Sequence, residues 1–250
     1  MRAVVAVLVA LVVLLLVARA CRAPGADAVV FGAGGDMGAA HVGFVLFMEE
    51  RGLLPMRFAG SSVGAVVAAG CAMRMDARAM AREWHVLDYA ALVAGLAASG
   101  LADDAMLRYF RMMVERRTGR ADTTFAELHR LMGTTLVVAV TCVGLRACVY
   151  MTHTDPAYAD VPVALALRMS CSLRSMEPVL YRGMLYEDGG VTDALPLAAF
   201  GSGNVIGVRL VRGPHAPRAP NVACVSTGTG RDPTELMRRG YEAARAFWMC

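Results

Sequence analysis

The most informative stretch of this chain is Gly60–Gly64, with the sequence G-S-S-V-G. It matches G-x-S-x-G, the nucleophile elbow, in which a serine sits on a sharp and strained turn from a strand to a helix. Ser62 is the central residue of the match. Because such a turn brings backbones close together, we expect a side chain at Gly60 or Gly64 to collide with the adjoining strand or helix.

The residues on either side of the elbow predict a β-α-β unit. Ala28–Phe31 is a short apolar strand, Gly32–Gly38 is a glycine turn, and Ala39–Arg51 carries apolar residues at helical spacing. Arg57–Ala59 then leads into the elbow, and Val63–Met73 forms the next helix. The crossover makes the two strands parallel neighbours. Both glycine turns therefore lie at carboxyl ends of strands, where open α/β sheets place their sites.

The glycine turn does not fit the patterns of nucleotide-binding loops. A dinucleotide-binding turn requires G-x-G-x-x-G, whereas the sixth position from Gly32 is Met37. That pattern also needs an acid near the end of the second strand, where this chain has Ser61 and Ser62. A Walker A loop requires lysine, and the chain contains no lysine. The same absence excludes Schiff-base chemistry and Ser-Lys dyads.

A serine nucleophile needs a proton acceptor, and Asp188 is the candidate. It follows a predicted strand, Met184–Glu187, and precedes the pair Gly189 and Gly190. Asp188 thus falls at the carboxyl end of a strand, where it could meet Ser62. Asp-Gly is also a strong turn signal, so the spacing alone leaves an ordinary turn aspartate as an open alternative.

Three motifs in this order resemble the patatin-like phospholipase family. They are G-A-G-G-D-M-G-A-A-H-V-G from Gly32, A-G-S-S-V-G-A from Ala59 and M-L-Y-E-D-G-G-V-T-D-A-L-P from Met184. A fourth stretch, A-L-R-M-S-C-S from Ala166, resembles the helix end and serine loop before the family's aspartate. The resemblance runs from about Ala28 to Leu197. It implies an α/β fold, a three-layer sandwich with a mostly parallel central sheet.

The resemblance also implies a catalytic pair of serine and aspartate without a histidine. Ser62 matches the nucleophile and Asp188 the general base, which favours a catalytic aspartate over a turn residue. The backbone N–H groups of Gly34 and Gly35 match the oxyanion hole. The further glycines of the motifs are Gly38, Gly60, Gly64 and Gly189.

No histidine is needed for such a pair. We expect His41, on the helix after the glycine turn, to be a packed and hydrogen-bonded residue rather than a base. A Ser-His-Asp triad is the minor alternative. The chain order of its members would favour His215, which lies in a Pro-rich loop.

Four positions depart from the family pattern. Ala33 replaces the first glycine of the oxyanion turn, and Met37 replaces an arginine or lysine. Asp193 stands where asparagine is usual, and Arg174 where proline is usual. Loss of the cation at Met37 would weaken stabilisation of the oxyanion or of a substrate phosphate. A slow enzyme, or one with an altered substrate preference, is therefore expected.

The expected function is a lipid acyl hydrolase of the phospholipase or lysophospholipase type, working through an acyl-enzyme intermediate. Its substrate would be a phospholipid or another acyl lipid at a membrane surface. The alternative is a catalytically weak or inactive lipid-binding protein on the same fold. No clusters of His, Cys, Asp or Glu have metal-ligand spacing, so neither a metal nor another cofactor is predicted.

The N-terminus predicts a membrane-directed segment. Ala3–Ala18 is an unbroken apolar run between Arg2 and Arg19. As a helix it would be about 24 Å long at 1.5 Å per residue, against a hydrocarbon core of about 30 Å. We expect a single-pass N-terminal anchor. A cleaved signal peptide ending near Ala18–Ala20 and a buried helix are the alternatives, and cleavage would make the protein secreted.

The remaining sequence fits one domain. We expect residues 1–26 to form the apolar segment and its linker, and residues 27–250 to form the catalytic domain. The net charge of +4 is modest, and no nucleic-acid-binding motif accompanies it. Nucleic acid is therefore not a predicted partner, and the sequence does not define an oligomeric state.

Overall fold

The centre of the molecule is a mixed β-sheet. The computed structural model describes residues 25–86, 104–173, 176–213 and 219–249. In these ranges the sheet has eight strands, of which seven follow the order β5-β6-β3-β2-β1-β7-β8 and the eighth, β4, pairs with β3. The strands are β1 (Ala28–Phe31), β2 (Arg57–Ser61), β3 (Thr135–Cys142), β4 (Ala147–Thr152), β5 (Val179–Tyr181), β6 (Met184–Asp188), β7 (Val205–Val211) and β8 (Val222–Ser226).

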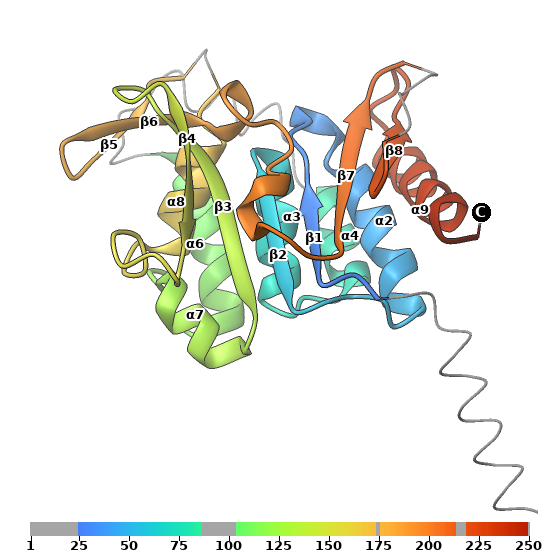
Figure 1. Ribbon diagram of the computed structural model, residues 1–250, viewed down its shortest axis with the longest axis horizontal. Helices are drawn as coiled ribbons and strands as arrows, with labels where there is room; N and C mark the ends of the chain where they lie inside the picture. Colours follow the sequence, from blue (N-terminus) through green and yellow to red (C-terminus); the bar gives the residue numbers. More distant parts are fainter. Residues whose placement is uncertain (1–24, 87–103, 174–175, 214–218, 250) are drawn as a thin grey trace, which may run out of the picture.

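The strands β3, β2, β1, β7 and β8 are parallel, whereas β4, β5 and β6 run antiparallel to their neighbours. The predicted β-α-β unit is confirmed, because β1 and β2 are parallel neighbours with Val29 opposite Phe58 and Phe31 opposite Gly60. The carboxyl ends of the parallel strands all meet at one edge of the sheet, at the top of Figure 1.

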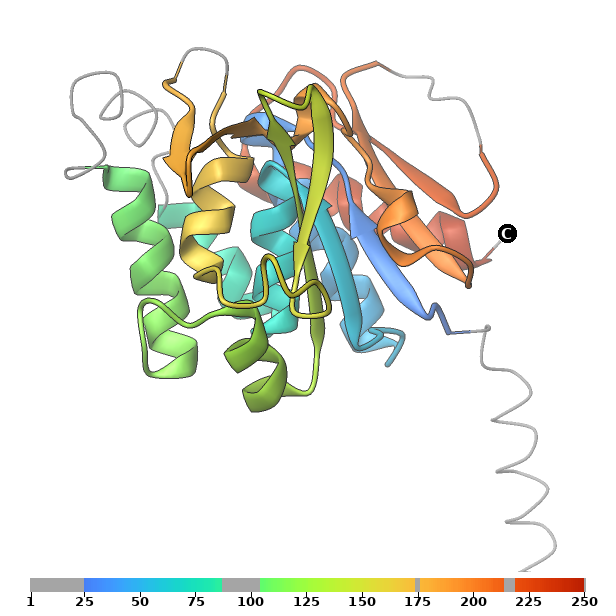
Figure 2. The same ribbon diagram turned by 60° about the vertical axis from the view of Figure 1, so that its left-hand side comes forward.

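Helices cover one face of this sheet (Figures 1 and 2). Three short 3₁₀ helices lie in the connections, and one of them, η4, lies on the opposite face. The helices are α2 (Ala39–Glu50), α3 (Val63–Ala72), α4 (Ala77–Val86), α6 (Ala105–Thr118), α7 (Phe125–Met132), α8 (Val163–Ser170) and α9 (Pro233–Met249), with η1 (Gly35–Met37), η3 (Gly189–Val191) and η4 (Leu197–Phe200).

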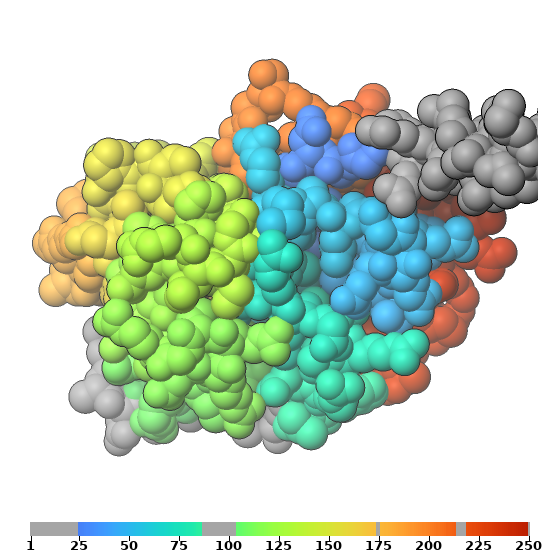
Figure 3. Space-filling model, turned by 90° about the horizontal axis from the view of Figure 1, so that it is seen from below, coloured from blue at the N-terminus to red at the C-terminus, as the bar shows by residue number. Residues whose placement is uncertain are grey.

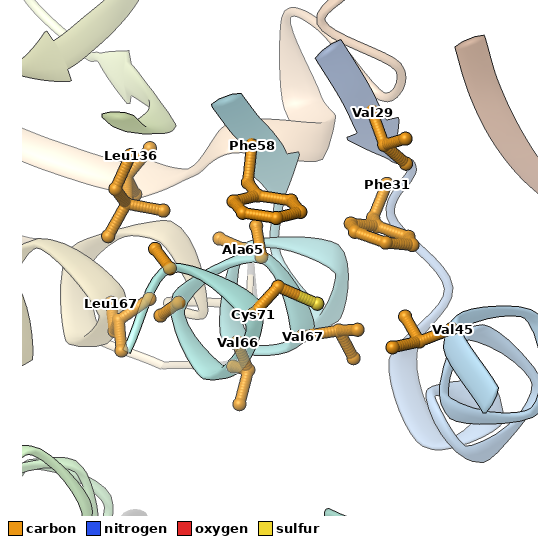
Figure 4. Close-up of a cluster of buried hydrophobic side chains, with 14 of the residues drawn as sticks. Val29, Phe31, Val45, Phe58, Ala65, Val66, Val67, Cys71, Leu136 and Leu167 are labelled. Carbon is orange, nitrogen blue, oxygen red and sulfur yellow. The ribbon is translucent and has the colours of Figure 1, made fainter. Parts of the chain in front are cut away.

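Alternation along the strands sorts side chains between the two faces. In β1, Val29 and Phe31 belong to the large core on the helical side, whereas Ala28 and Val30 belong to a small core on the other side. This is the period of two that a pleated strand imposes. Figure 4 shows the large core where α3 packs against β1 and β2, with labelled residues Val29, Phe31, Val45, Phe58, Ala65, Val66, Val67, Cys71, Leu136 and Leu167.

The expected third layer is reduced in the described residues. The second face of the sheet is covered by the segment around η4, where Phe200 packs with Ala28, Val30 and Ala59. The strands there carry small residues, so a short 3₁₀ helix is enough to bury them. The described residues thus form one helical layer against a mixed α/β sheet, whose second face is covered by the segment around η4.

Two strands share one edge of β3. The first part of β3 pairs with β2, and this pairing ends with Ser61 opposite Ala139. The pairing with β6 begins at the next residue, with Asp188 opposite Val140. Because β2 is parallel and β6 antiparallel to β3, their carboxyl ends meet head to head on this edge. The strand β4 occupies the other edge of β3.

The start of β3 is fixed by a well-capped helix. Thr124 accepts a hydrogen bond from the N–H of Glu127, and the Glu127 carboxylate accepts one from the N–H of Thr124. This reciprocal arrangement is a capping box, which satisfies two otherwise free donors. Gly133, with φ of 67°, ends α7 and turns the chain into β3. Figure 3 shows this end of the molecule, opposite to the carboxyl ends of the parallel strands.

None of the helices in the described ranges has the length and hydropathy needed to span a membrane. The apolar run Ala3–Ala18, for which an anchor or signal segment was predicted, lies outside those ranges.

The helices α2 and α9 cross at two glycines. A Cβ atom on Gly43 would lie 1.9 Å from the carbonyl oxygen of Met237, and one on Gly240 would lie 1.8 Å from that of Ala40. Both separations are far below van der Waals contact, and both obstructing atoms are backbone. The close packing of α9 on the domain therefore depends on the absence of a side chain at these two positions.

We predict that Gly240→Ala destabilises the protein by about 1–3 kcal/mol, because the methyl group forces the two helices apart. Helix propensity alone would stabilise an alanine over a glycine by about 1 kcal/mol, so packing and propensity predict opposite signs. Urea unfolding followed by circular dichroism measures the difference. Gly230→Ala is the matched control, since a Cβ atom there has open space. A stabilised Gly240→Ala variant would refute the close crossing.

Candidate active site

The turn between β2 and α3 holds Ser62 in a strained backbone conformation. Ser62 has φ of 54° and ψ of −129°. A positive φ is uncommon for a residue with a Cβ atom, and such strain persists only where the surroundings enforce it. The residue is 4% exposed. The turn thus points a nearly buried hydroxyl toward the carboxyl edge of the sheet.

The glycines around Ser62 are required by close backbone contacts. A Cβ atom on Gly60 would lie 2.2 Å from the carbonyl oxygen of Gly64, and one on Gly64 would lie 2.2 Å from that of Phe31. The predicted collisions with helix and strand are confirmed. The other two motif glycines are similar, because a Cβ atom on Gly38 would meet the ring of Trp84 and one on Gly189 would meet the Ala139 carbonyl.

The structure brings Asp188 against Ser62. The Ser62 hydroxyl donates a hydrogen bond of 2.7 Å to Oδ2 of Asp188. The other carboxylate oxygen, Oδ1, accepts one of 2.8 Å from the N–H of Gly190. The backbone of Asp188 is held as well, since its N–H donates to the carbonyl of Ser172 and its carbonyl accepts from the Thr141 hydroxyl. The carboxylate is therefore fixed at both oxygens and along its backbone.

Burial raises the pKa of Asp188 above the ordinary carboxyl range. The hydrogen bonds from Ser62 and Gly190 lower this pKa, and the charge of the neighbouring Glu187 raises it. Desolvation is the largest of these effects, because the side chain is removed from water while receiving only two described hydrogen bonds. The result is a carboxylate that binds a proton more readily than an exposed aspartate.

The end of α8 supports both residues, in a way that motif spacing did not reveal. The Ser170 hydroxyl accepts a hydrogen bond of 2.9 Å from the N–H of Ser62 and donates one of 2.7 Å to the Ala139 carbonyl. Ser170 is fully buried. It therefore ties the strained elbow to β3, and it occupies the N–H of Ser62.

Ser172 lies two residues further on, and its carbonyl accepts a hydrogen bond from the N–H of Asp188. The Ser172 hydroxyl accepts a hydrogen bond from Arg168, whose guanidinium also forms a buried ion pair with Asp104. The sequence signal was the stretch Arg168–Ser172, in which three polar residues follow an apolar helix face at intervals of two. Buried polar groups of this kind are hydrogen-bonded, and here they hold the site.

The glycine turn after β1 faces Ser62 across a cavity of about 390 Å³. The cavity is lined by Ala33, Gly34, Gly35, Ser62, Leu173, Asp188, Gly190 and Val191. The N–H groups of Gly34 and Gly35 have no hydrogen-bond acceptor among the described residues. Gly35 has φ of 57°, which favours glycine at this position. Two free backbone donors and a serine hydroxyl therefore share one cavity.

The departures at Ala33 and Met37 have different consequences. Ala33 is not among the described residues with positive φ, so a side chain is tolerated there. Its N–H donates to the Ala194 carbonyl and its side chain lines the cavity. Met37 is 8% exposed, and its sulfur accepts a hydrogen bond from the Thr227 hydroxyl. The position of the family's cation is thus filled by an apolar side chain directed into the protein.

Asp193, the third departure, has a local role. Its carboxylate accepts a hydrogen bond of 2.6 Å from the Tyr150 hydroxyl and another from the N–H of Leu195. Burial is the largest cause that raises the pKa of Tyr150, and the hydrogen bond to Asp193 raises it further. The carboxylate fixes the turn that follows the site. Arg174, the fourth departure, lies outside the described residues.

His41 is a structural residue, as predicted. It is fully buried, and its Nε2 lies 2.8 Å from the Gly32 carbonyl oxygen. Burial lowers the pKa of His41 to about 4, against the raising effect of this hydrogen bond. The ring is therefore neutral at pH 7 and anchors the glycine turn from behind. His215, the alternative base, lies outside the described residues.

The fold and the site together define an α/β protein with a nucleophile elbow, in which the serine contacts a buried carboxylate. The chain belongs to the patatin-like phospholipase family, whose model matches residues 29–200.

Individual relatives are more distant. Triacylglycerol lipase ptl3 of Schizosaccharomyces pombe is 30% identical over 129 residues, which cover 47% of this chain and 27% of the lipase. VipD from Legionella pneumophila has a similar structure, with a TM-score of 0.69 and 15% identity over 91% of this chain and 67% of VipD. ExoU from Pseudomonas aeruginosa, solved in complex with SpcU, has a TM-score of 0.58 and 18% sequence identity, over 91% of this chain and 53% of the matched chain. At these identities the two structures show the shared fold alone.

We predict that Ser62→Gly is more stable than Ser62→Ala by about 1 kcal/mol, because only glycine relieves the strain of the positive φ. Both changes remove the hydroxyl, so the comparison isolates the backbone. Thermal unfolding of the two purified variants measures it.

The control pair is Glu115→Gly and Glu115→Ala, at an exposed position within α6. There the alanine variant should be the more stable by about 1 kcal/mol. If the alanine variant were the more stable one at Ser62 as well as at Glu115, the elbow would carry no strain.

Proposed function

We propose that the protein is a lipid acyl hydrolase in which Ser62 is the nucleophile and Asp188 the general base. The observation that carries the proposal is the hydrogen bond of 2.7 Å between the Ser62 hydroxyl and Oδ2 of Asp188. A nucleophile and its base must lie within this reach for proton transfer. Family membership supports the same reaction class.

The first half of the proposed reaction transfers the acyl group to the protein. Asp188 takes the hydroxyl proton while Ser62 Oγ attacks the ester carbonyl carbon. The oxyanion that forms accepts hydrogen bonds from the free N–H groups of Gly34 and Gly35. The tetrahedral intermediate collapses with loss of the alcohol, to which Asp188 returns the proton, and the acyl group remains on Ser62.

The second half releases the fatty acid. Asp188 removes a proton from a water molecule, whose oxygen attacks the acyl carbon, and the same two N–H groups stabilise the second oxyanion. Collapse breaks the bond to Ser62 Oγ, which regains its proton from Asp188. The raised pKa of Asp188 suits this role, because a stronger base accepts the proton more easily at neutral pH.

The cavity supports an acyl-lipid substrate. Leu173 and Val191 line it beside the polar groups, so an acyl chain can lie against apolar surface while its carbonyl reaches the turn. The name of the relative, a triacylglycerol lipase, supports the same substrate class. We propose that the protein works at a membrane surface, anchored by the N-terminal apolar run, with secretion after cleavage as the alternative.

We predict that a fluorophosphonate probe labels the protein at Ser62, because the probe reacts with activated serine hydroxyls. Labelling, read by intact-protein mass spectrometry, should disappear in Ser62→Ala. Ser61→Ala is the matched control and should remain labelled, since the Ser61 hydroxyl is buried and without a described partner.

Asp188→Asn should lose ester hydrolysis while remaining folded. Folding raises the pKa of Asp188, so the ionised carboxylate lowers the stability of the folded protein at pH values above that pKa. The neutral amide of asparagine does not carry this penalty. Well-folded wild-type protein that neither reacts with the probe nor hydrolyses esters would instead support the non-catalytic lipid-binding alternative.

We predict that activity falls as the pH drops through the raised pKa of Asp188, because the protonated carboxyl cannot accept the serine proton. The acid limb of kcat against pH should therefore lie above the ordinary aspartate value of 3.8. A soluble short-chain ester gives the profile. Glu187→Gln should move the limb to lower pH, since the Glu187 charge contributes to raising the pKa of Asp188. An acid limb at or below the ordinary value would contradict this role.

A further inference from the structure

Two arginines converge on the residue that follows the oxyanion turn. Nε of Arg231 lies 2.7 Å from Oδ2 of Asp36, and Nη2 of Arg212 lies 3.7 Å from Oδ1. Arg212 follows β7, and Arg231 lies between β8 and α9. Because β1, β7 and β8 are parallel, their carboxyl ends bring these side chains to the edge of the sheet that carries Ser62.

The carboxylate that the two arginines contact belongs to the residue after the oxyanion turn. Gly34 and Gly35 line the cavity, and Asp36 is the next residue of the same turn. Both guanidinium groups therefore contact the residue that directly follows the two N–H groups of the proposed oxyanion hole. No long or mobile connection separates them, because Asp36 is part of η1.

The charge of this cluster is not balanced. Two guanidinium groups meet one carboxylate, so the cluster of Asp36, Arg212 and Arg231 keeps one net positive charge. The side chains of Arg212 and Arg231 are 69% and 73% exposed, whereas that of Asp36 is 17% exposed. Each guanidinium has five N–H donors, and each contact with Asp36 engages one nitrogen. Most of the donors of the two exposed guanidinium groups are thus not engaged by Asp36.

The cluster also occurs where the chain lacks its expected cation. Met37 stands at the basic position of the family pattern and is packed against Thr227. The positive charge near the oxyanion turn comes instead from segments distant in sequence. Exposed ion pairs contribute little to stability, so the convergence of two arginines on one partly buried carboxylate is not explained by folding alone.

We propose that Arg212 and Arg231 form a subsite for the phosphate group of a lipid substrate. The proposal rests on the proposed function and names the substrate class of the same site. In a glycerophospholipid the phosphate is only a few bonds from the ester carbonyls, so a carbonyl at Gly34 and Gly35 places the phosphate near Asp36. Guanidinium groups bind phosphate oxygens through paired, charge-assisted hydrogen bonds, whereas a neutral acylglycerol offers them no anionic partner.

The test compares two short-chain substrates that differ only in the phosphate: dihexanoyl phosphatidic acid and dihexanoylglycerol. We expect wild-type protein to prefer the phosphate-bearing substrate. The double variant Arg212→Ala/Arg231→Ala should lose about 10-fold or more in kcat/KM on phosphatidic acid, as expected for lost charge-assisted bonds. Its kcat/KM on dihexanoylglycerol should change by less than about 3-fold, because the reacting groups are untouched.

Arg120→Ala is the matched control. Arg120 is also 69% exposed and pairs with a partly buried carboxylate, that of Glu127, but it lies beside α7 at the opposite end of the sheet. The Arg120→Ala substitution should leave kcat/KM unchanged on both substrates. An equal loss on both substrates in the double variant, or no loss on phosphatidic acid, would overturn the subsite and leave the hydrolase proposal intact.

Binding to Ser62→Ala protein separates the subsite from catalysis. In calorimetric titration, dihexanoyl phosphatidic acid should bind more tightly than dihexanoylglycerol. The two arginine substitutions should remove this difference in affinity. Inorganic phosphate should bind much more weakly than the lipid. Equal affinity for inorganic phosphate and for phosphatidic acid would identify a site for free anions and refute a lipid subsite. If the wild-type protein hydrolyses neither substrate, the proposed function fails, and this titration alone decides the subsite.

Discussion

The edge of β3 is the constraint on which the rest of the site depends. Two strands that enter from opposite directions pair with successive residues of this edge, so that Ser61 faces Ala139 and Asp188 faces Val140. Backbone hydrogen bonding fixes the spacing of the strands, and the spacing fixes the side chains that follow. The contact between Ser62 and Asp188 is therefore set by sheet register rather than by flexible side chains.

The same arrangement imposes two costs that the surrounding structure must offset. Ser62 is strained because the chain turns sharply from β2 into α3, and Asp188 is desolvated because its side chain is largely buried at the end of β6. The end of α8 supports both residues, through the Ser170 hydroxyl and the Ser172 backbone carbonyl. Ser170 bonds the elbow to β3, and Ser172 holds the backbone of Asp188. Strain and a raised pKa are features that functional sites commonly retain.

Local sequence was sufficient for the elements nearest to the elbow. The spacing of glycines and apolar residues predicted β1, α2, β2 and α3 within a few residues, because turn geometry and helical periodicity are local properties. The resemblance of three motifs supplied Asp188 as the partner of Ser62. The stretch from Ala166 to Ser172 was recognised as a motif, but the role of Ser170 as a support was not predicted, because its two hydrogen bonds join residues 108 and 31 positions away.

Residue types and their spacing were enough to identify the elbow at Ser62 and the parallel β-α-β unit, and the composition alone excluded lysine chemistry. The packing of the segment around η4 on the second face of the sheet, and the inward direction of Met37, became evident from the folded chain. The tertiary structure also decided that Arg212 and Arg231 meet at Asp36. These contacts could not be read from local sequence, because they join segments that the sheet brings together in space although they are distant in the chain.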